Sequence, residues 1–170
     1  MLAILDAVWK GRTIHLLDDK DQALTQLAQE IAAVALEDGG KIISEILARE
    51  RGHNCSIGLG VACPHARAPG RGELVCAVGW NGLGIDYGAC NGQPVHLVIM
   101  YRIPEDKRAA YLEEMAAISR ALKAIGEKPV TNEKERTAFI NALIEQTKGA
   151  AQPAASFRPG KALAAKLKKV

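Results

Sequence analysis

The chain has 170 residues and a mass of 18.2 kDa, which is enough for one domain that buries a core without disulfides or metal ions. Apolar residues make up 48% and charged residues 24% of the sequence, and this balance excludes a disordered or fibrous chain. No apolar stretch is long enough to cross a bilayer, and the N-terminus lacks the pattern of a secretion signal. We therefore expect a cytoplasmic protein without membrane insertion.

Charge is divided unevenly along the chain. Six of the 22 basic residues lie in 148–170, which contains no acidic residue, so residues 1–147 carry 16 basic and 19 acidic side chains. The stretch that begins at Gly149 is rich in Ala, Pro and Gly, as linkers are. We expect a domain over 1–148, followed by a linker and basic C-terminal tail over 149–170. Because short charged ends are usually just solvated, we expect no nucleic-acid partner.

The first third of the chain predicts a strand followed by two helices. A short β-prone run is followed by a polar cluster at 18–21, which can cap a helix. Apolar residues then recur at three- and four-residue steps until Gly39 and Gly40 stop the pattern. The expected elements are a strand at 13–17, helices at 22–36 and 41–50, and a loop at 52–60.

The remainder predicts three strands and two further helices. Asn-Gly pairs at 81–82 and 91–92 are typical of turns between strands. The first of the two helices should bury Leu112, Met115, Ile118 and Leu122. The expected strands lie at 61–63, 73–80 and 95–101, and the expected helices at 104–125 and 131–148. This order of elements predicts an α/β fold, a three-layer α/β/α sandwich with a mixed β-sheet flanked by helices.

The four cysteines are Cys55, Cys63, Cys76 and Cys90. An even number could form two disulfides, but the chain carries no signal for an oxidising compartment. We therefore expect buried free thiols, which behave as small apolar side chains.

Residues 58–67 are the most informative segment for function. Gly58 and Gly60 allow backbone amides to approach an anion closely. His65 follows a short predicted strand, where a side chain is held by the sheet and still reaches solvent. Taken alone, a histidine in this setting is more often structural than catalytic. The segment therefore raises the hypothesis of an exposed histidine nucleophile but does not decide it.

A longer pattern resembles the IIA proteins of the fructose, mannitol and nitrogen-regulatory phosphotransferase class. Arg49-Glu50 is followed by a glycine-containing loop and by the run from Gly60 to Ala66, with Arg49 sixteen positions before His65 as in that family. The stretch 84–98 also resembles the family pattern that leads into a strand. The resemblance implies that His65 accepts a phosphoryl group from an HPr-like phosphocarrier protein, and that no cofactor or metal ion is needed.

The same resemblance assigns roles to the residues around His65. Arg49 would grip two phosphoryl oxygens with its planar guanidinium, and Ser56 with the amides near Gly58 and Gly60 would donate further hydrogen bonds. The chain departs from the family in its loop, where Asn54-Cys55-Ser56 replaces the usual Ser-Thr-Gly, and at Tyr111, where the family has a second histidine. The resemblance adds Tyr111 to the phosphoryl-binding group.

Two other functions remain open at the level of sequence. His53, Cys55, Cys63 and His65 are residue types that bind zinc, although their spacing is not that of a zinc knuckle. A non-catalytic interaction module with the same fold would also fit the changes at Cys55 and Tyr111. Within the phosphotransferase reading, the sequence contains no permease, which favours regulatory protein targets in the nitrogen-related branch over a separate IIB component for sugar uptake.

Overall fold

The structure is a computed structural model that describes residues 1–149. The predicted linker and basic tail lie outside this part of the chain, apart from Gly149. Among the described residues, every helix is too short or too polar to serve as a membrane span. The elements in chain order are α1 (Ala3–Trp9), β1 (Thr13–His15), α2 (Lys20–Ala35), α3 (Gly39–Gly52), β2 (Ser56–Gly58), β3 (Val61–Ala62), β4 (His65–Ala68), β5 (Val75–Ile85), β6 (Val95–Pro104), a 3-10 turn (Glu105–Lys107), α4 (Arg108–Ala124) and α5 (Glu133–Gly149).

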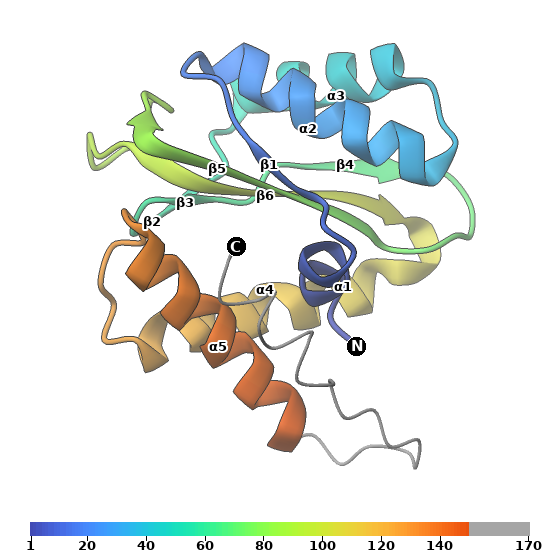
Figure 1. Cartoon of the computed structure of the whole chain (residues 1–170). Coiled ribbons are helices and arrows are strands. Elements are labelled where there is room, and N and C mark those ends of the chain that lie inside the picture. Colours follow the sequence, from blue (N-terminus) through green and yellow to red (C-terminus); the bar gives the residue numbers. More distant parts are fainter. Residues whose placement is uncertain (150–170) are drawn as a thin grey trace.

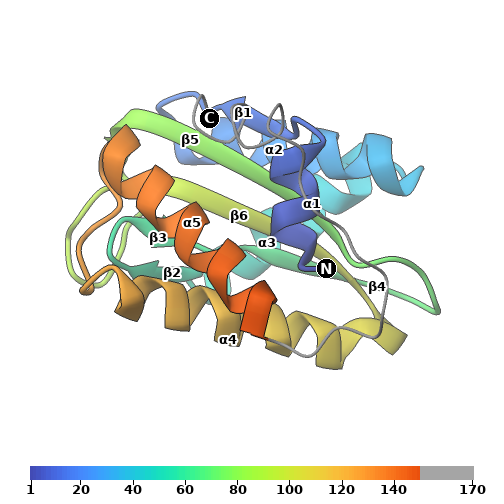
Figure 2. The ribbon, with the colours of Figure 1, turned by 60° about the horizontal axis from the view of Figure 1, so that its bottom comes forward.

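Within residues 1–149, six strands form one mixed sheet in the order β1-β5-β6-β3-β2, with β4 also paired to β6. β5 runs antiparallel to β6, while β3 and β4 run parallel to it. Helices α2 and α3 lie on one side of the sheet (Figure 1), and α1, α4 and α5 cover the other, as the turned view shows (Figure 2). The predicted three-layer α/β/α sandwich is confirmed.

Strand β6 divides the core into two halves. All ten of its residues are buried, as expected for a central strand with helices on both faces. Alternate side chains point to opposite faces, so Leu97, Ile99 and Tyr101 join the cluster under α1, α4 and α5. Val98 and Met100 join the cluster under α2 and α3. Apolar burial on both faces therefore fixes the register of this strand.

The edge of β6 opposite β5 is shared by two short strands. β3 pairs with its first half, where Val61 lies opposite Leu97. The chain then leaves the sheet at Cys63 and Pro64 and returns as β4, where His65 lies opposite Tyr101. The Tyr101 amide donates to the Pro64 carbonyl at 3.0 Å. His65 is thus the first residue of β4 rather than a residue after a strand, and it follows directly on the interruption.

The boundary between α2 and α3 differs from the prediction in a specific way. The polar cluster caps α2 as expected, because the Asp19 carboxylate accepts from the Gln22 amide. Leu36, in a left-handed conformation, ends the helix. Gly39 and Gly40, predicted to stop α2, begin α3 instead, because Asp38 accepts from the Gly40 amide as its N-cap. A side-chain cap decided the role of these glycines.

Two predicted loops turn out to contain strand. The predicted loop over 52–60 contains β2, which forms a tight hairpin with β3. The Asn-Gly pair at 81–82 lies inside β5, where the pairing with β6 shifts register between Trp80 and Ile85. The Asn81 side chain donates to the Leu16 carbonyl. Asn81 therefore stabilises an irregularity within the strand and not the predicted turn.

Some exposed apolar residues depart from the predicted helix faces. Leu112, predicted to be buried in α4, is 65% exposed, whereas Ile118 and Leu122 are buried as expected. The buried face of α4 passes instead through Glu114 and Ala117.

Of the four free cysteines, Cys55, Cys63 and Cys76 are buried as predicted, but Cys90 is exposed in a loop.

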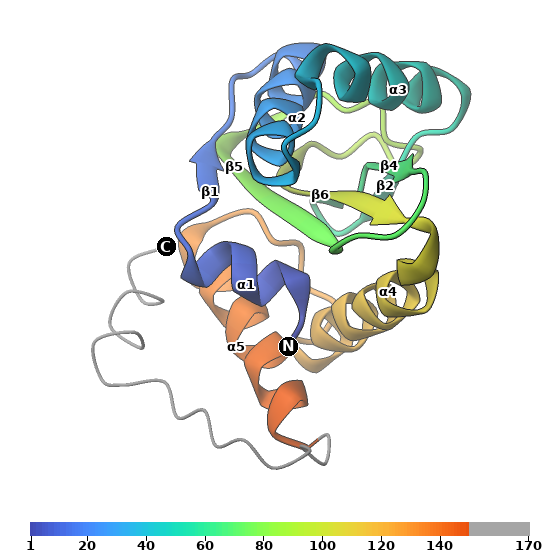
Figure 3. The ribbon, with the colours of Figure 1, turned by 90° about the vertical axis from the view of Figure 1, so that its right-hand side faces the viewer.

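Helix α1 was not predicted. Its own N-cap residue, Leu2, provides no side-chain hydrogen bond. The cap comes from Glu114 of α4, a buried carboxylate that accepts from the Ala3 and Ile4 amides and from the Tyr101 hydroxyl. Figure 3 shows α1 lying beside α5 under the sheet. One carboxylate therefore joins the N-terminal helix to α4 and to the central strand.

We expect Glu114→Ala to destabilise the protein by about 3 kcal/mol, because it leaves two helix amides and a tyrosine hydroxyl without an acceptor in the core. Denaturant unfolding followed by circular dichroism measures this loss. Glu113→Ala, at the exposed neighbouring position, is the matched control and should change stability by less than about 0.5 kcal/mol. Equal unfolding midpoints for the two variants would contradict the proposed cap.

Candidate functional site

His65 and Arg49 line the same open pocket between α3 and β4. The other lining residues are Glu45, Ala66 and Arg67. Arg49 lies in the last turn of α3 and is exposed, while His65 is half-buried at the start of β4. The structure therefore brings together the two residues that the sequence singled out, although sixteen positions separate them.

One nitrogen of the His65 ring faces the protein. Its Nδ1 atom lies 3.4 Å from the Cys63 carbonyl oxygen and 3.2 Å from the Tyr111 hydroxyl oxygen. The His65 and Tyr111 rings are 5.1 Å apart between centroids, and Tyr111 in turn packs edge-on against Tyr101. A carbonyl oxygen can only accept, so a proton on Nδ1 satisfies it. With Nδ1 engaged in this way, Nε2 keeps the free lone pair.

The surroundings of His65 favour its neutral form. Burial lowers the pKa of His65 from its usual value, and the nearby positive charges of Arg49 and Arg67 lower the pKa further. The hydrogen bond to the Cys63 carbonyl opposes part of this change. Burial also raises the pKa of Tyr111 to about 12, so its hydroxyl keeps its proton. The site thus combines a neutral imidazole with two cationic side chains.

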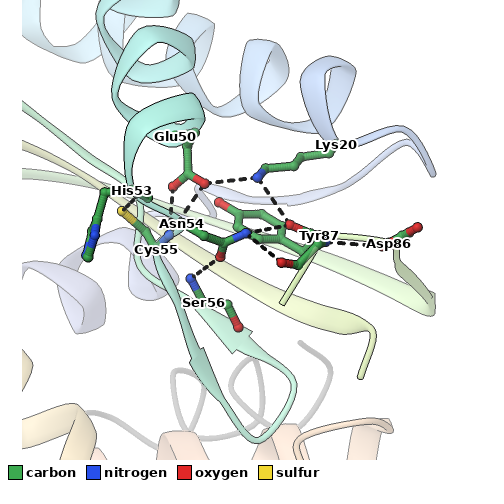
Figure 4. A network of polar contacts seen from close by, with 9 residues as sticks. Lys20, Glu50, His53, Asn54, Cys55, Ser56, Asp86 and Tyr87 are labelled. Carbon is green, nitrogen blue, oxygen red and sulfur yellow. Dashed lines mark hydrogen bonds and ion pairs between the residues drawn. The ribbon is translucent and has the colours of Figure 1, made fainter. Parts of the chain in front are cut away.

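A network of polar contacts holds the loop that follows Arg49 (Figure 4). The buried carboxylate of Glu50 accepts from the Cys55 amide and pairs with Lys20 at 3.0 Å. The Lys20 ammonium also lies 4.1 Å from the centre of the Tyr87 ring and donates to the Tyr87 carbonyl. Asn54 donates to the same carbonyl. These contacts connect the end of α3 to the loop before β6, and they hold the backbone next to Arg49 in place.

The chain matches a protein-family model over residues 10–148, described as phosphoenolpyruvate-dependent sugar phosphotransferase system, EIIA 2. It belongs to this family. The nitrogen regulatory protein of Bradyrhizobium diazoefficiens is 31% identical over 107 residues, which are 63% of this chain and 70% of that relative. The family model and this relative confirm the predicted phosphotransferase IIA class and its nitrogen-regulatory branch.

Solved structures share the fold. The nitrogen regulatory protein IIA-Ntr of Neisseria meningitidis superposes with a TM-score of 0.63 and 22% identity, over 75% of this chain and 93% of that chain. The mannitol IIA enzyme of Escherichia coli, in complex with phosphorylated IIB, gives a TM-score of 0.56 and 14% identity, over 79% and 95%. At these identities the similarity concerns the fold alone.

In this EIIA protein the other predicted phosphoryl-binding residues lie in and around the β2–β3 hairpin. Ser56 is in β2, and its hydroxyl is 3.5 Å from the Gly58 amide. The Gly60 carbonyl accepts from the His96 and Leu97 amides. A side chain on Gly60 would come within 2.9 Å of the Val130 carbonyl. Gly60 therefore has a packing role, and its predicted contact with a phosphoryl group stays a prediction, as do those of Ser56 and Gly58.

The zinc alternative is not supported. Within residues 1–149, no group of three or more His, Cys, Asp or Glu side chains is arranged to hold a metal ion. Burial raises the pKa of Cys55 to about 12 and that of Cys63 well above its usual range. Zinc binds cysteine in its thiolate form, and burial disfavours this form at both positions.

Sequence reasoning missed two residues of the pocket, Glu45 and Arg67. Local spacing could have indicated both. Glu45 precedes Arg49 by four residues, one helical turn on the same face, and Arg67 follows His65 by two, the same face of a strand. The pocket therefore contains one acidic and two basic side chains beside the imidazole.

We expect His65 to titrate below its usual pKa of 6.5, so its ring stays neutral at pH values where an exposed histidine is protonated. Arg49→Met should raise this pKa, because it removes a positive charge that disfavours imidazolium. Histidine ring signals followed by NMR against pH measure both values. Arg51→Met, on the same helix end, is the control and should leave the His65 pKa unchanged. A His65 that titrates identically in both variants would contradict this electrostatic coupling.

Proposed function

We propose that this EIIA protein is a phosphocarrier in which His65 receives a phosphoryl group from the phosphohistidine of an HPr-like carrier and passes it to an acceptor. The observation that carries the proposal is the pairing of a neutral, half-buried imidazole with Arg49 in one open pocket. A phosphohistidine needs a nucleophile that reaches its partner and a cation that grips the transferred group. His65 and Arg49 supply these two functions.

The transfer step uses the Nε2 lone pair. This nitrogen attacks the phosphorus of the carrier's phosphohistidine, and the new N–P bond forms while the old N–P bond breaks. The electron pair of the broken bond stays on the carrier's ring nitrogen, and a proton on the other nitrogen of that ring makes the leaving group a neutral imidazole. The proton on Nδ1 stays in place, directed at the Cys63 carbonyl. Because Nδ1 is hydrogen-bonded to the protein, the ring is oriented before the phosphoryl group arrives, which lowers the entropy cost of alignment.

Charge on the phosphoryl oxygens is balanced by the protein. The transition state of phosphoryl transfer is loose, so positioning and electrostatics provide most of the catalysis. The guanidinium of Arg49 has the planar fork that binds two oxygens. Ser56 and the backbone amides near Gly58 and Gly60 are the further donors that we propose. Tyr111 is a further donor that we propose: its hydroxyl lies 3.2 Å from Nδ1 of His65, and it would have to turn away from this nitrogen to reach a phosphoryl oxygen on Nε2.

We favour regulatory proteins as the acceptors of the phosphoryl group, and we place this transfer in the cytoplasm. The support is that the relative from Bradyrhizobium and the structure from Neisseria are both named nitrogen regulatory proteins. A separate IIB component is the second candidate, since the mannitol IIA neighbour forms a complex with phosphorylated IIB. Transfer to purified IIB proteins would favour the second candidate.

We expect the purified chain, incubated with phosphoenolpyruvate, the first enzyme of the system and the HPr-like carrier, to gain the mass of one phosphoryl group. His65→Ala should gain none, because it removes the nucleophile. Mass spectrometry under neutral conditions measures both. His96→Ala is the matched control, since that ring is buried beside Asn81, and a folded form of it should still be phosphorylated. Equal masses before and after incubation in wild type would favour the non-catalytic interaction module.

Replacing Tyr111 by histidine should increase the phosphorylated fraction at equilibrium with the carrier. A protonated imidazole would donate a charge-assisted hydrogen bond to the phosphoryl group, roughly twice as strong as the neutral one from a tyrosine hydroxyl. Tyr111→Phe, which keeps the ring and removes the hydroxyl, should lower the fraction. The measurement is again the ratio of the two masses. An unchanged ratio in Tyr111→His would remove this role for the residue.

A further inference from the structure

Arg102 is a buried cation that lies next to the proposed phosphoryl pocket without lining it. Its side chain is only 1% exposed, and its strand position on β6 is opposite Ala66 of β4. Nε and Nη2 donate to the carboxylate of Glu37, in the loop between α2 and α3. Nη1 donates both to Glu45 of α3 and to the Arg67 carbonyl, each at 2.6 Å. One guanidinium therefore joins β6, β4 and α3.

Glu45 is the partner that matters for the pocket. It lies one helical turn before Arg49 and lines the same pocket. A glutamate and an arginine four residues apart on a helix are neighbours that can form an ion pair. In this structure the Glu45 carboxylate is bound to Arg102 instead. Glu45 therefore does not occupy the guanidinium of Arg49, which in this structure interacts with the Cys55 thiol.

We propose that Arg102 is a positioning residue for phosphoryl transfer, which holds the Glu45 carboxylate away from Arg49 and His65 and fixes the backbone of β4 at Arg67. The inference rests on the proposed function of His65. Arg102 itself does not line the phosphoryl pocket, and four of its five N–H donors bind two carboxylates and a carbonyl. Its effect passes through Glu45 and through the Arg67 carbonyl.

Charge explains why this position matters. A phosphoryl group on histidine carries negative charge, so a carboxylate that is free to move in the pocket would repel it and compete for Arg49. Glu37 and Glu45 are 30% and 37% exposed, and water could solvate both without a buried partner. Replacing a buried ion pair by apolar side chains is often neutral or stabilising. Stability alone therefore does not account for a buried arginine at this position.

The sharpest test compares two changes at Glu45. Glu45→Gln keeps the length of the side chain and a carbonyl that accepts from Arg102, and it removes the charge. Glu45→Asp keeps the charge but is one methylene too short to preserve the contact with Arg102. We expect Glu45→Asp to raise the KM for the phosphorylated carrier by about three- to fivefold, a ratio typical of a single partly exposed charge pair. Glu45→Gln should leave the KM at or below the wild-type value.

A second set of variants tests Arg102 directly. Arg102→Met releases both carboxylates and should lower phosphoryl transfer. Adding Glu45→Gln to Arg102→Met should restore part of the transfer, because the released charge is gone from the pocket while the contact with the Arg67 carbonyl stays lost. Adding Glu37→Gln is the matched control, since Glu37 lines a different cavity with Arg12 and Arg71, and it should restore nothing. Thermal unfolding of each variant verifies that the fold is retained.

The outcomes separate this inference from the proposed function. A wild-type chain that takes up no phosphoryl group contradicts both. Transfer by the wild type, with the same KM in Glu45→Asp and Glu45→Gln, contradicts only the role of Arg102 and Glu45. Equal rescue of Arg102→Met by Glu37→Gln and Glu45→Gln also contradicts it, because general relief of buried charge would then be the cause. If Arg102→Met does not fold, the two Glu45 variants decide.

Discussion

The site depends on the way two short strands share one edge of β6. β3 and β4 pair with successive halves of this edge, and the chain leaves the sheet between them at Cys63 and Pro64. The Tyr101 amide pairs with the Pro64 carbonyl and holds this segment against β6, so the preceding Cys63 carbonyl points away from β6 and faces the imidazole of His65. This arrangement gives His65, the proposed nucleophile, both a fixed orientation and access to solvent.

Long-range contacts from the opposite layer complete this orientation. Tyr111 belongs to α4, under the other face of the sheet from α3, and its hydroxyl reaches the same ring nitrogen as the Cys63 carbonyl. Tyr101 connects this pair to Glu114, whose carboxylate also caps α1. The imidazole is thus supported by the same buried contacts that hold the N-terminal helix. Because these groups are packed in the core, small movements of His65 would cost packing energy.

The sequence was informative where contacts are local and where a family pattern is present. The helix and strand periodicities predicted the three layers, and the resemblance to the IIA family predicted that Arg49 and His65 act together. Helix α1 escaped prediction because its cap, Glu114, lies 111 residues away from Ala3. The role of Arg102 escaped for the same reason, since its partners Glu37 and Glu45 are 65 and 57 residues distant. No local pattern marks contacts of this kind.

Both acidic neighbours of Arg49 on α3 are engaged by other cations. Glu50, the next residue, is paired with Lys20, and Glu45, one turn earlier, is paired with Arg102. Glu45, which lies on the same face of α3 as Arg49 and lines the same pocket, could if released compete with a phosphoryl group for the guanidinium of Arg49. Lys20 comes from α2, in the helical layer, and Arg102 comes from β6, in the sheet, so each of these two layers contributes one cation. The charge available to an incoming phosphoryl group is therefore set by residues outside the pocket, and the pocket keeps two guanidiniums beside a neutral imidazole.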